Sequence, residues 1–306
     1  AYNYRILIWS WYSLVRVPLD GGKHKGNQVC AKTKKGDCRE ILRTAMKIVQ
    51  ANNGLSYLSF PETRLSEVAH GFFTRKGGVS PHPFDSLNLS ISTGDTRENV
   101  RKNRDLLFPA IDRQPGSMFD VWQVHSDTII FSDKPRGNEE PIKADAIFTN
   151  NPSVTLLMRF ADCVPILIYD PVRKVVGIIH AGWQGTVKQI AKKAIARLAE
   201  EFGCNPEDIQ AVIGPAISAH HYQIGEEVHH QAIPLFENVQ GVIDKTKDGH
   251  VTLNLPLANE ELLKQTGVRS VLQSQICTAC DTENWYSHRA EKGQTGRFAA
   301  VIGLNE

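Results

Sequence analysis

Three short strings contain the residues of this sequence that are best suited to chemistry. They are Trp122-Gln123-Val124-His125, Ala161-Asp162-Cys163-Val164-Pro165 and His180-Ala181-Gly182-Trp183. Each borders an apolar run that predicts a β-strand, so each places a thiol or an imidazole where a strand meets a loop. Thiolate sulfur and imidazole nitrogen are common zinc donors in proteins. His125, Cys163 and His180 are therefore candidate ligands of one metal site.

A predicted hairpin brings two of these candidates together. Its strands are the apolar runs Val164–Asp170 and Lys174–Ile179. If Tyr169 faces Lys174 across the turn, the antiparallel ladder sets Cys163 directly opposite His180. Their Cβ atoms would then lie about 4.5–5.5 Å apart on one face of the sheet, and a one-residue slip would separate them.

With His125 as the third ligand, the predicted site resembles a catalytic zinc centre. Three protein ligands leave a fourth position for water or substrate. The alternative is a buried cysteine beside two histidines that have ordinary hydrogen-bond partners. Spacing alone does not choose between these two interpretations.

The remaining cysteines and histidines give weaker signals. In a chain of 306 residues, six cysteines do not form a disulfide framework, so we expect free thiols and a cytoplasmic protein. The pair Cys277-x-x-Cys280 could be half of a structural zinc site, a redox pair or two buried thiols, and we favour buried thiols. We expect the pairs His220-His221 and His229-His230 on the surfaces of a loop and a helix, not among the ligands.

Basic residues beside glycines are candidates for binding phosphate or sugar. Arg75 precedes Gly77-Gly78, and Arg289 and Arg297 flank a second Gly-containing segment. Glycine-rich turns with arginine can hold phosphate or sugar hydroxyls. Solvated turns have the same composition, and that interpretation also stays open.

Composition and charge narrow the class of protein. Apolar residues make up 41% and charged residues 22%, which excludes a disordered chain. No apolar run is long enough to predict a membrane span. Residues 1–45 carry nine Lys/Arg against three acids, so the rest of the chain is mildly acidic although the whole has a net charge of +2. This balance argues against a nucleic-acid partner.

Residues 1–45 differ from the rest in composition and show no regular period. We predict that they form an atypical extension outside the fold, and a docked N-terminal arm is the alternative. Residues 46–306 are predicted to form one compact mixed-sheet α/β (α+β) domain, a layered αββα-like sandwich. Helices are expected over Asp95–Leu107, Thr186–Phe202, Glu226–Phe236 and Leu257–Thr266. Strands are expected in a hairpin over residues 46–62, at both ends of Met118–Ile130, and over Asp145–Phe148, Val154–Met158, Ile209–Ile213, Val268–Leu272 and Phe298–Gly303.

Taken together, the strings resemble one protein family from about Leu58 to Leu304. Besides the three metal-ligand strings, the matching motifs are Thr74-Arg75-Lys76-Gly77-Gly78-Val79-Ser80, Ser86-Leu87-Asn88-Leu89, Gly94-Asp95, Asn103-Arg104, Ile213-Gly214-Pro215, Cys277-Thr278, Ser287-His288-Arg289 and Thr295-Gly296-Arg297-Phe298. The family is the bacterial laccase-domain proteins (Cu-oxidase-4 type, YfiH/YlmD-like). They were long labelled multicopper polyphenol oxidases and are now described as zinc-dependent purine nucleoside phosphorylases.

The resemblance implies a zinc site at His125, Cys163 and His180, which would also be the catalytic residues. It implies phosphorolysis of adenosine, inosine, guanosine and methylthioadenosine, together with adenosine deamination. Arg75, Asn88, Arg289 and Arg297 are the expected substrate-binding residues. Two positions depart from the family pattern: Gln184 stands where the family has Arg or Lys, and Arg159-Phe160 stands where the family has a small polar residue two before Ala-Asp-Cys. A cation would then have moved from one loop to the other.

Three functions follow from these observations. The first is a nucleoside enzyme that acts on a purine nucleoside and phosphate as a monomer or weak homo-oligomer, without membrane or nucleic-acid partners. The second is a copper-dependent polyphenol oxidase, which the family label suggests. Ordinary laccases build their three-copper cluster from His-x-His pairs, and this sequence has none. The third is a non-catalytic thiol–zinc protein that docks on a partner.

Overall fold

Two six-stranded sheets and one small sheet make up the β structure of this computed structural model, which describes residues 46–305. The first large sheet has the order β1 (Lys47–Gln50), β2 (Ser56–Ser59), β3 (Val68–Phe73), β15 (Phe298–Leu304), β7 (Thr155–Phe160), β4 (Met118–Asp120). The second has the order β14 (Ser270–Gln273), β10 (Gln210–Ile213), β8 (Val164–Asp170), β9 (Val175–Ala181), β6 (Ala146–Thr149), β5 (Ile129–Phe131). The small sheet joins β11 (Gln223–Ile224), β13 (Val251–Leu253) and β12 (Ile243–Lys245).

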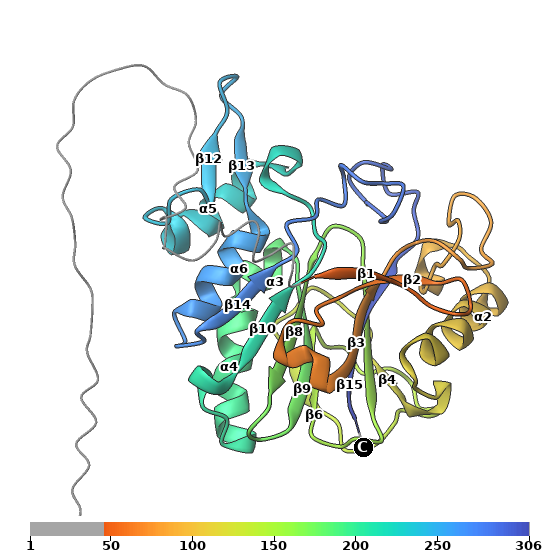
Figure 1. The fold of residues 1–306 in the computed structure, drawn as a ribbon. Helices are drawn as coiled ribbons and strands as arrows, with labels where there is room; N and C mark the ends of the chain where they lie inside the picture. Colours follow the sequence, from red (N-terminus) through yellow and green to blue (C-terminus); the bar gives the residue numbers. More distant parts are fainter. Residues whose placement is uncertain (1–45, 306) are drawn as a thin grey trace, which may run out of the picture. The chain divides into compact units, whose positions relative to one another are not determined.

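Residues 46–305 form five α-helices (Figure 1). They are α2 (Arg97–Leu107), α3 (Trp183–Val187), α4 (Ile190–Phe202), α5 (Glu226–Phe236) and α6 (Leu255–Lys264). Within the described residues, no helix combines the length and apolar character that a bilayer crossing needs. The prediction for residues 1–45 lies outside the part of the chain that the structure describes.

Three apolar clusters define the layers between these elements. The first packs β8 and β9 against α4 and α6, the second fills the space between the two large sheets, and the third packs β15 and β7 against α2. The order of layers is therefore helix, sheet, sheet, helix. This order confirms the predicted mixed α/β fold with αββα layering. The layers form because the inner strands carry apolar residues on both faces, so that each large sheet packs against the other sheet on one face and against helices on the other.

The hairpin β8–β9 has a different register from the predicted one. Tyr169 pairs with Val176. The ladder begins at the pair Val164–Ala181, so Cys163 lies one residue outside it. The carboxylate of Asp170 accepts hydrogen bonds from the amides of Val172 and Arg173. The capped turn has the predicted four residues but lies one residue further along the chain, because Asp170 pairs with Val175 and the turn takes in Lys174.

The change in register leaves the geometry of the predicted pair nearly intact. In the observed ladder Pro165, not Cys163, lies opposite His180. Cys163 and Pro165 are two residues apart, so both face the same side of the sheet. Cys163 is thus a diagonal neighbour of His180 instead of a direct one, and the two side chains still meet.

The predicted helix Thr186–Phe202 is divided into two. Gln189 adopts a left-handed conformation with φ of 60°, which ends α3 and starts α4 at Ile190. Thr186 is not an N-cap, because it lies inside α3 and its hydroxyl donates to the carbonyl oxygen of Gly182. The predicted end is confirmed, since Gly203 closes α4 with φ of 65°.

The two predicted strands of Met118–Ile130 belong to different sheets. β4 pairs with β7 in the first large sheet, and β5 pairs with β6 in the second. The segment between them therefore crosses from one sheet to the other. Its Gln123 side chain exchanges two hydrogen bonds of 2.8 Å with the backbone of Arg159 on β7, which fixes the path of the loop that carries His125.

Close packing within the second large sheet leaves no space for a side chain at Gly177. A Cβ atom at Gly177 on β9 would lie 1.9 Å from the ring of Phe148, its partner on β6. We expect Gly177→Ala to lower the free energy of unfolding by about 1–3 kcal/mol, because the ring must move in a packed core. Urea unfolding measures the change. Gly116→Ala is the control, since nothing lies within 4 Å of its Cβ position; an equal loss in both variants would contradict the prediction.

Candidate metal centre

One edge of the second large sheet gathers the chemically active side chains. Strand directions place the carboxyl ends of β14, β10 and β9 at the same edge as the amino ends of β8, β6 and β5. Cys163 comes just before β8, His180 lies at the end of β9, and His125 lies in the loop before β5. Residues from three separate strings thereby reach one point.

A buried carboxylate organises this point. Asp145, fully buried just before β6, accepts a hydrogen bond of 2.7 Å from Nδ1 of His180. It also accepts from the consecutive backbone amides of Val124, His125 and Ser126, and from the Ser126 hydroxyl. Burial alone would raise the pKa of Asp145, but the hydrogen bonds from His180 and Ser126 outweigh it and lower the pKa to about 2.

These bonds set the orientation of both histidines. His125 adopts φ of 59°, a conformation that costs energy for a residue with a side chain, and the three amides held by Asp145 stabilise it. Since Nδ1 of His180 is used by Asp145, its Nε2 is the nitrogen left to face Cys163. Carboxylate–histidine pairs of this kind are typical of zinc sites.

The three predicted ligands converge. The candidate ligand atoms of His125, Cys163 and His180 all lie within 4.8 Å of one another, and Cys163 Sγ is 3.7 Å from His125 Nε2. The His125 and His180 rings meet edge to face, with centroids 4.9 Å apart. This arrangement of two nitrogens and one sulfur could hold a zinc ion.

Electrostatics favours the thiolate at Cys163. Burial would raise the pKa of this thiol, but the His180 and His125 imidazoles outweigh it and lower the pKa to about 6. Burial would likewise lower the pKa of His180, yet Cys163 and Asp145 raise it to about 9. The thiolate is the form that binds metals.

A glycine makes room for the cluster. In the observed register Gly182 follows the last β8–β9 pair, beside Cys163. A Cβ atom at Gly182 would lie 2.9 Å from Cys163 Sγ and 3.0 Å from His125 Cδ2. The glycine of the His-Ala-Gly-Trp string is therefore required by the close approach of two candidate ligands, since its own φ of −73° suits any residue.

Two of the predicted substrate-binding residues are structural in position. Arg75 is buried, with its guanidinium on Glu291, the carbonyl oxygens of Asp85 and Thr282, and the ring of Tyr286. It borders a cavity of about 570 Å³ that none of the three candidate ligands lines.

Asn88 has no exposed surface. Its amide donates to Ser90, Thr93 and Asp95, and its Oδ1 accepts from the backbone amide of Arg297. Asn88 therefore holds the backbone at Arg297.

The other two arginines lie nearer to the candidate ligands. Arg289 is exposed, and its guanidinium stacks over the ring of Tyr222. Its backbone amide donates a hydrogen bond of 2.7 Å to the carboxylate of Asp162, which fixes the backbone at this residue. Arg297 is half-buried, and burial lowers its pKa although Cys163 and Asp162 oppose the shift. The charge of Cys163 therefore acts electrostatically on the Arg297 guanidinium.

The cation that was expected to have moved to Arg159 already has a carboxylate partner, which it shares with Arg136. The Arg159 guanidinium bonds to Asp120 at 2.5 Å and to the carbonyl oxygen of Leu89. Gln184, the other departure, lies in α3, half-buried.

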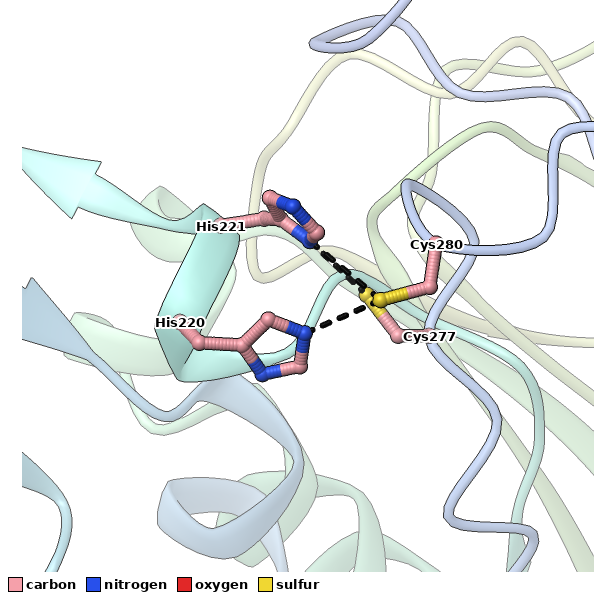
Figure 2. A group of neighbouring side chains, drawn as sticks. All are labelled: His220, His221, Cys277 and Cys280. Atoms are coloured by element: carbon pink, nitrogen blue, oxygen red, sulfur yellow. Dashed lines mark hydrogen bonds between the residues drawn. The ribbon is translucent and has the colours of Figure 1, made fainter.

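A second cluster was missed by the interpretation of the sequence. The ligand atoms of His220, His221, Cys277 and Cys280 lie within 4.8 Å of one another (Figure 2). The expectation of two buried thiols is wrong for Cys280, which is exposed, whereas Cys277 is buried. The parallel pairing of β10 with β14 brings the cluster together, because the segments after two neighbouring parallel strands leave the sheet at one edge, and no local sequence pattern records that pairing.

Fold and site together define a class: a mixed α/β sandwich with a His₂Cys cluster at a sheet edge. Residues 69–305 match the family described as multi-copper polyphenol oxidoreductase laccase, so the chain belongs to this family. The resemblance inferred from the sequence is thereby confirmed.

Relatives and solved structures agree with this assignment. The chain is 37% identical over 249 residues to the purine nucleoside phosphorylase YlmD of Bacillus subtilis, covering 78% of this chain and 90% of the relative. It is 38% identical over 240 residues to a purine nucleoside phosphorylase of Deinococcus radiodurans, covering 78% and 89%. The crystal structure of YlmD from Geobacillus stearothermophilus is similar, with a TM-score of 0.78 and 32% identity over 82% of this chain and 96% of that chain. The hypothetical protein YfiH of Bacillus licheniformis has a TM-score of 0.77 and 33% identity over 84% and 97%.

The space at Gly182 gives a selective test of the metal cluster. We expect Gly182→Ala to reduce the zinc content of the purified protein, because the new methyl group separates Cys163 Sγ from His125 by more than the tolerance of about 0.2 Å in zinc–ligand distances. Elemental analysis measures the zinc.

The control is Gly225→Ala. Gly225 is also the N-cap of a helix with nearly the same backbone angles (φ −83°, ψ 174°, against −73° and 179°), and nothing lies within 4 Å of its Cβ position. Full zinc content in Gly182→Ala would count against the cluster as a metal site.

The hydrogen bond from His180 to Asp145 should contribute to metal affinity. We expect Asp145→Asn to weaken zinc binding about 10–100-fold, because the amide replaces an anion that orients the imidazole. A competition titration with a chromogenic chelator measures the affinity. Glu139→Gln, an exposed carboxylate away from the cluster, is the control; equal affinities in the two variants would argue that Asp145 only shapes the loop.

Proposed function

We propose that this protein is a zinc-dependent purine nucleoside phosphorylase that also deaminates adenosine. Its substrates would be adenosine, inosine, guanosine and methylthioadenosine, each cleaved with phosphate to the free base and the sugar 1-phosphate. The observation that carries the proposal is the convergence of His125, Cys163 and His180 at one sheet edge, in a chain whose relatives are named for this activity.

The donor set fits zinc. A tetrahedral zinc with bonds of about 2.3 Å to sulfur and about 2.0–2.1 Å to nitrogen sets a sulfur and a nitrogen about 3.6 Å apart. Cys163 Sγ and His125 Nε2 are 3.7 Å apart. His125, Cys163 and His180 would hold the ion, which when bound would supply a Lewis acid with one open position.

In phosphorolysis the chain must hold phosphate beside the sugar. A phosphate oxygen forms a bond to C1′ while the C1′–N bond breaks, and the electron pair stays on the purine nitrogen, which gains a proton. Arg289 and Arg297 are the proposed phosphate or sugar contacts, because both lie near Asp162 and Cys163. Guanidinium groups suit phosphate through paired charge-assisted hydrogen bonds.

Deamination would use the same site. Water replaces the amino group at C6 of adenosine, and ammonia leaves. Asp145 would keep His180 oriented through both reactions, since its carboxylate remains ionised at neutral pH. We further expect a cytoplasmic monomer or weak homo-oligomer.

The copper oxidase suggested by the family description is the alternative. A His₂Cys site binds Cu(II) more tightly than Zn(II) in the general order of affinities, so phenol oxidation after copper loading would not identify the native metal. The absence of any His-x-His pair from the sequence disfavours a three-copper cluster.

The test is a product assay on protein purified without added metal. With adenosine or inosine and phosphate, we expect free base and ribose 1-phosphate in equal amounts, and no base without phosphate. Adenosine alone should yield inosine and ammonia. No base release, combined with phenol oxidation that requires several coppers per chain, would establish the oxidase instead.

Two variants sharpen this test. Cys163→Ala should abolish both reactions, because it removes a ligand. Arg289→Ala should lower kcat/KM for phosphorolysis about 10–100-fold, as loss of a charged hydrogen bond implies, and should affect deamination less. Lys247→Ala removes an exposed cation elsewhere and serves as the control. Equal losses of both activities in Arg289→Ala would remove the assigned phosphate contact.

A further inference from the structure

We propose that His220, His221, Cys277 and Cys280 form a second zinc site, structural in kind, that locks the loops around Arg289 and Asp162. This goes beyond the proposed function, and its test does not depend on any enzymatic activity.

The four donors lie close enough together for one tetrahedral Cys₂His₂ centre. The two sulfur–nitrogen distances made by His221 match that geometry, whereas His220 Nε2 would move away from Cys280 Sγ on metal binding. His220 Nε2 lies 3.0 Å from Cys280 Sγ, and His221 Nδ1 lies 3.5 Å from Cys280 Sγ and 3.7 Å from Cys277 Sγ. Zinc bonds of ordinary length require about 3.6 Å between sulfur and nitrogen. Figure 2 shows both imidazole rings directed at the two sulfurs.

Two different segments supply the donors, and both are held by backbone hydrogen bonds. His220 and His221 lie in the 3₁₀ turn η6 (Ala219–His221), and the cysteines lie in the loop after β14. Ala216 and Cys277 form a parallel bridge, and the amide of Ser218 donates to Cys277 Sγ. Hydrogen bonds from backbone amides to the sulfur support a thiolate ligand in zinc sites.

Four protein donors would close the coordination shell. A closed Cys₂His₂ set is typical of structural zinc, whereas the His125–Cys163–His180 cluster has three donors and leaves one position open. Cys277 and Cys280 are free thiols in this structure. The exposure of Cys280 and both histidines gives a metal ion access from solvent.

The same two segments hold residues beside the first cluster. The carbonyl oxygens of His221 and Gln223 accept from Arg289 Nη1 at 3.3 and 3.1 Å. Thr278, between the two cysteines, donates to Asp162 Oδ1 at 2.7 Å, and the Arg289 amide donates to Asp162 Oδ2. A metal that ties these segments together would therefore fix Arg289 and the residue that precedes Cys163.

The first experiment counts zinc in the full chain by elemental analysis. We expect two zinc ions in the wild type, one in Cys163→Ala, one in the double variant His220→Ala/Cys280→Ala, and none when all three changes are combined. His220 and Cys280 are exposed, so truncating them opens no core cavity. His230→Ala, an exposed histidine on α5, should keep the wild-type content. An unchanged zinc content in His220→Ala/Cys280→Ala would overturn the proposal.

The second experiment identifies the ligands. Cobalt-loaded Cys163→Ala should show thiolate-to-metal charge transfer and the visible bands of a tetrahedral ion, and adding His220→Ala/Cys280→Ala should remove both. A cobalt spectrum that survives the added changes would place the metal elsewhere and overturn the proposal.

A structural role predicts a loss of stability. The Tm of His220→Ala/Cys280→Ala should fall by about 5–10 °C, from the stabilisation that a bound metal gives a domain of this size. In the Cys163→Ala background, which keeps only this second site, a chelator should lower the Tm in the same way, and adding His220→Ala/Cys280→Ala should abolish that response. A Tm of Cys163→Ala that does not respond to the chelator would rule out the structural role.

Discussion

The hydrogen-bonded carboxylate of Asp145 is the constraint on which the candidate metal centre depends. One buried side chain fixes the imidazole of His180, and the hydrogen bonds that it accepts from three backbone amides hold His125 in a left-handed conformation. A buried carboxylate without partners would be strongly destabilising, so the two segments and Asp145 stabilise each other. Two ligands from separate strings are thereby positioned by one group that binds no metal.

Sheet topology brings the rest of the chemistry to the same edge. Because β8 runs opposite to its neighbours β9 and β10, the residue before β8 meets the residues at the ends of those two strands. Cys163 reaches His180 in this way, and the second cluster forms beyond β10 and β14. The carboxylate of Asp162, a residue with φ of 79°, accepts hydrogen bonds from the Thr278 hydroxyl and the Arg289 amide. These bonds link the two clusters.

The family description names a copper oxidoreductase, whereas the relatives are named purine nucleoside phosphorylases, and the donor set helps to weigh these two functions. Both clusters combine cysteine sulfur with imidazole nitrogen, and one has three donors while the other has four. Such sets suit zinc as an open and a closed site, respectively. The arginines also differ in their surroundings. Arg75 and Arg159 form internal ion pairs, whereas Arg289 lies exposed beside the first cluster.

The sequence by itself determined the local elements and the three-residue cluster. Strand β8 and helix α5 have the predicted bounds, because an apolar run or stripe records which face of an element is buried. Even the wrong hairpin register preserved the pairing of Cys163 with His180, since the shift of two residues kept both on one face. Only the tertiary structure revealed Asp145, the internal roles of Arg75 and Asn88, and the cluster of His220, His221, Cys277 and Cys280. Their partners are remote in the chain, 216 residues away for the Arg75–Glu291 pair, and depend on the order of strands in a sheet. Local periodicity carries no record of that order, because the same burial pattern fits many arrangements of neighbouring strands.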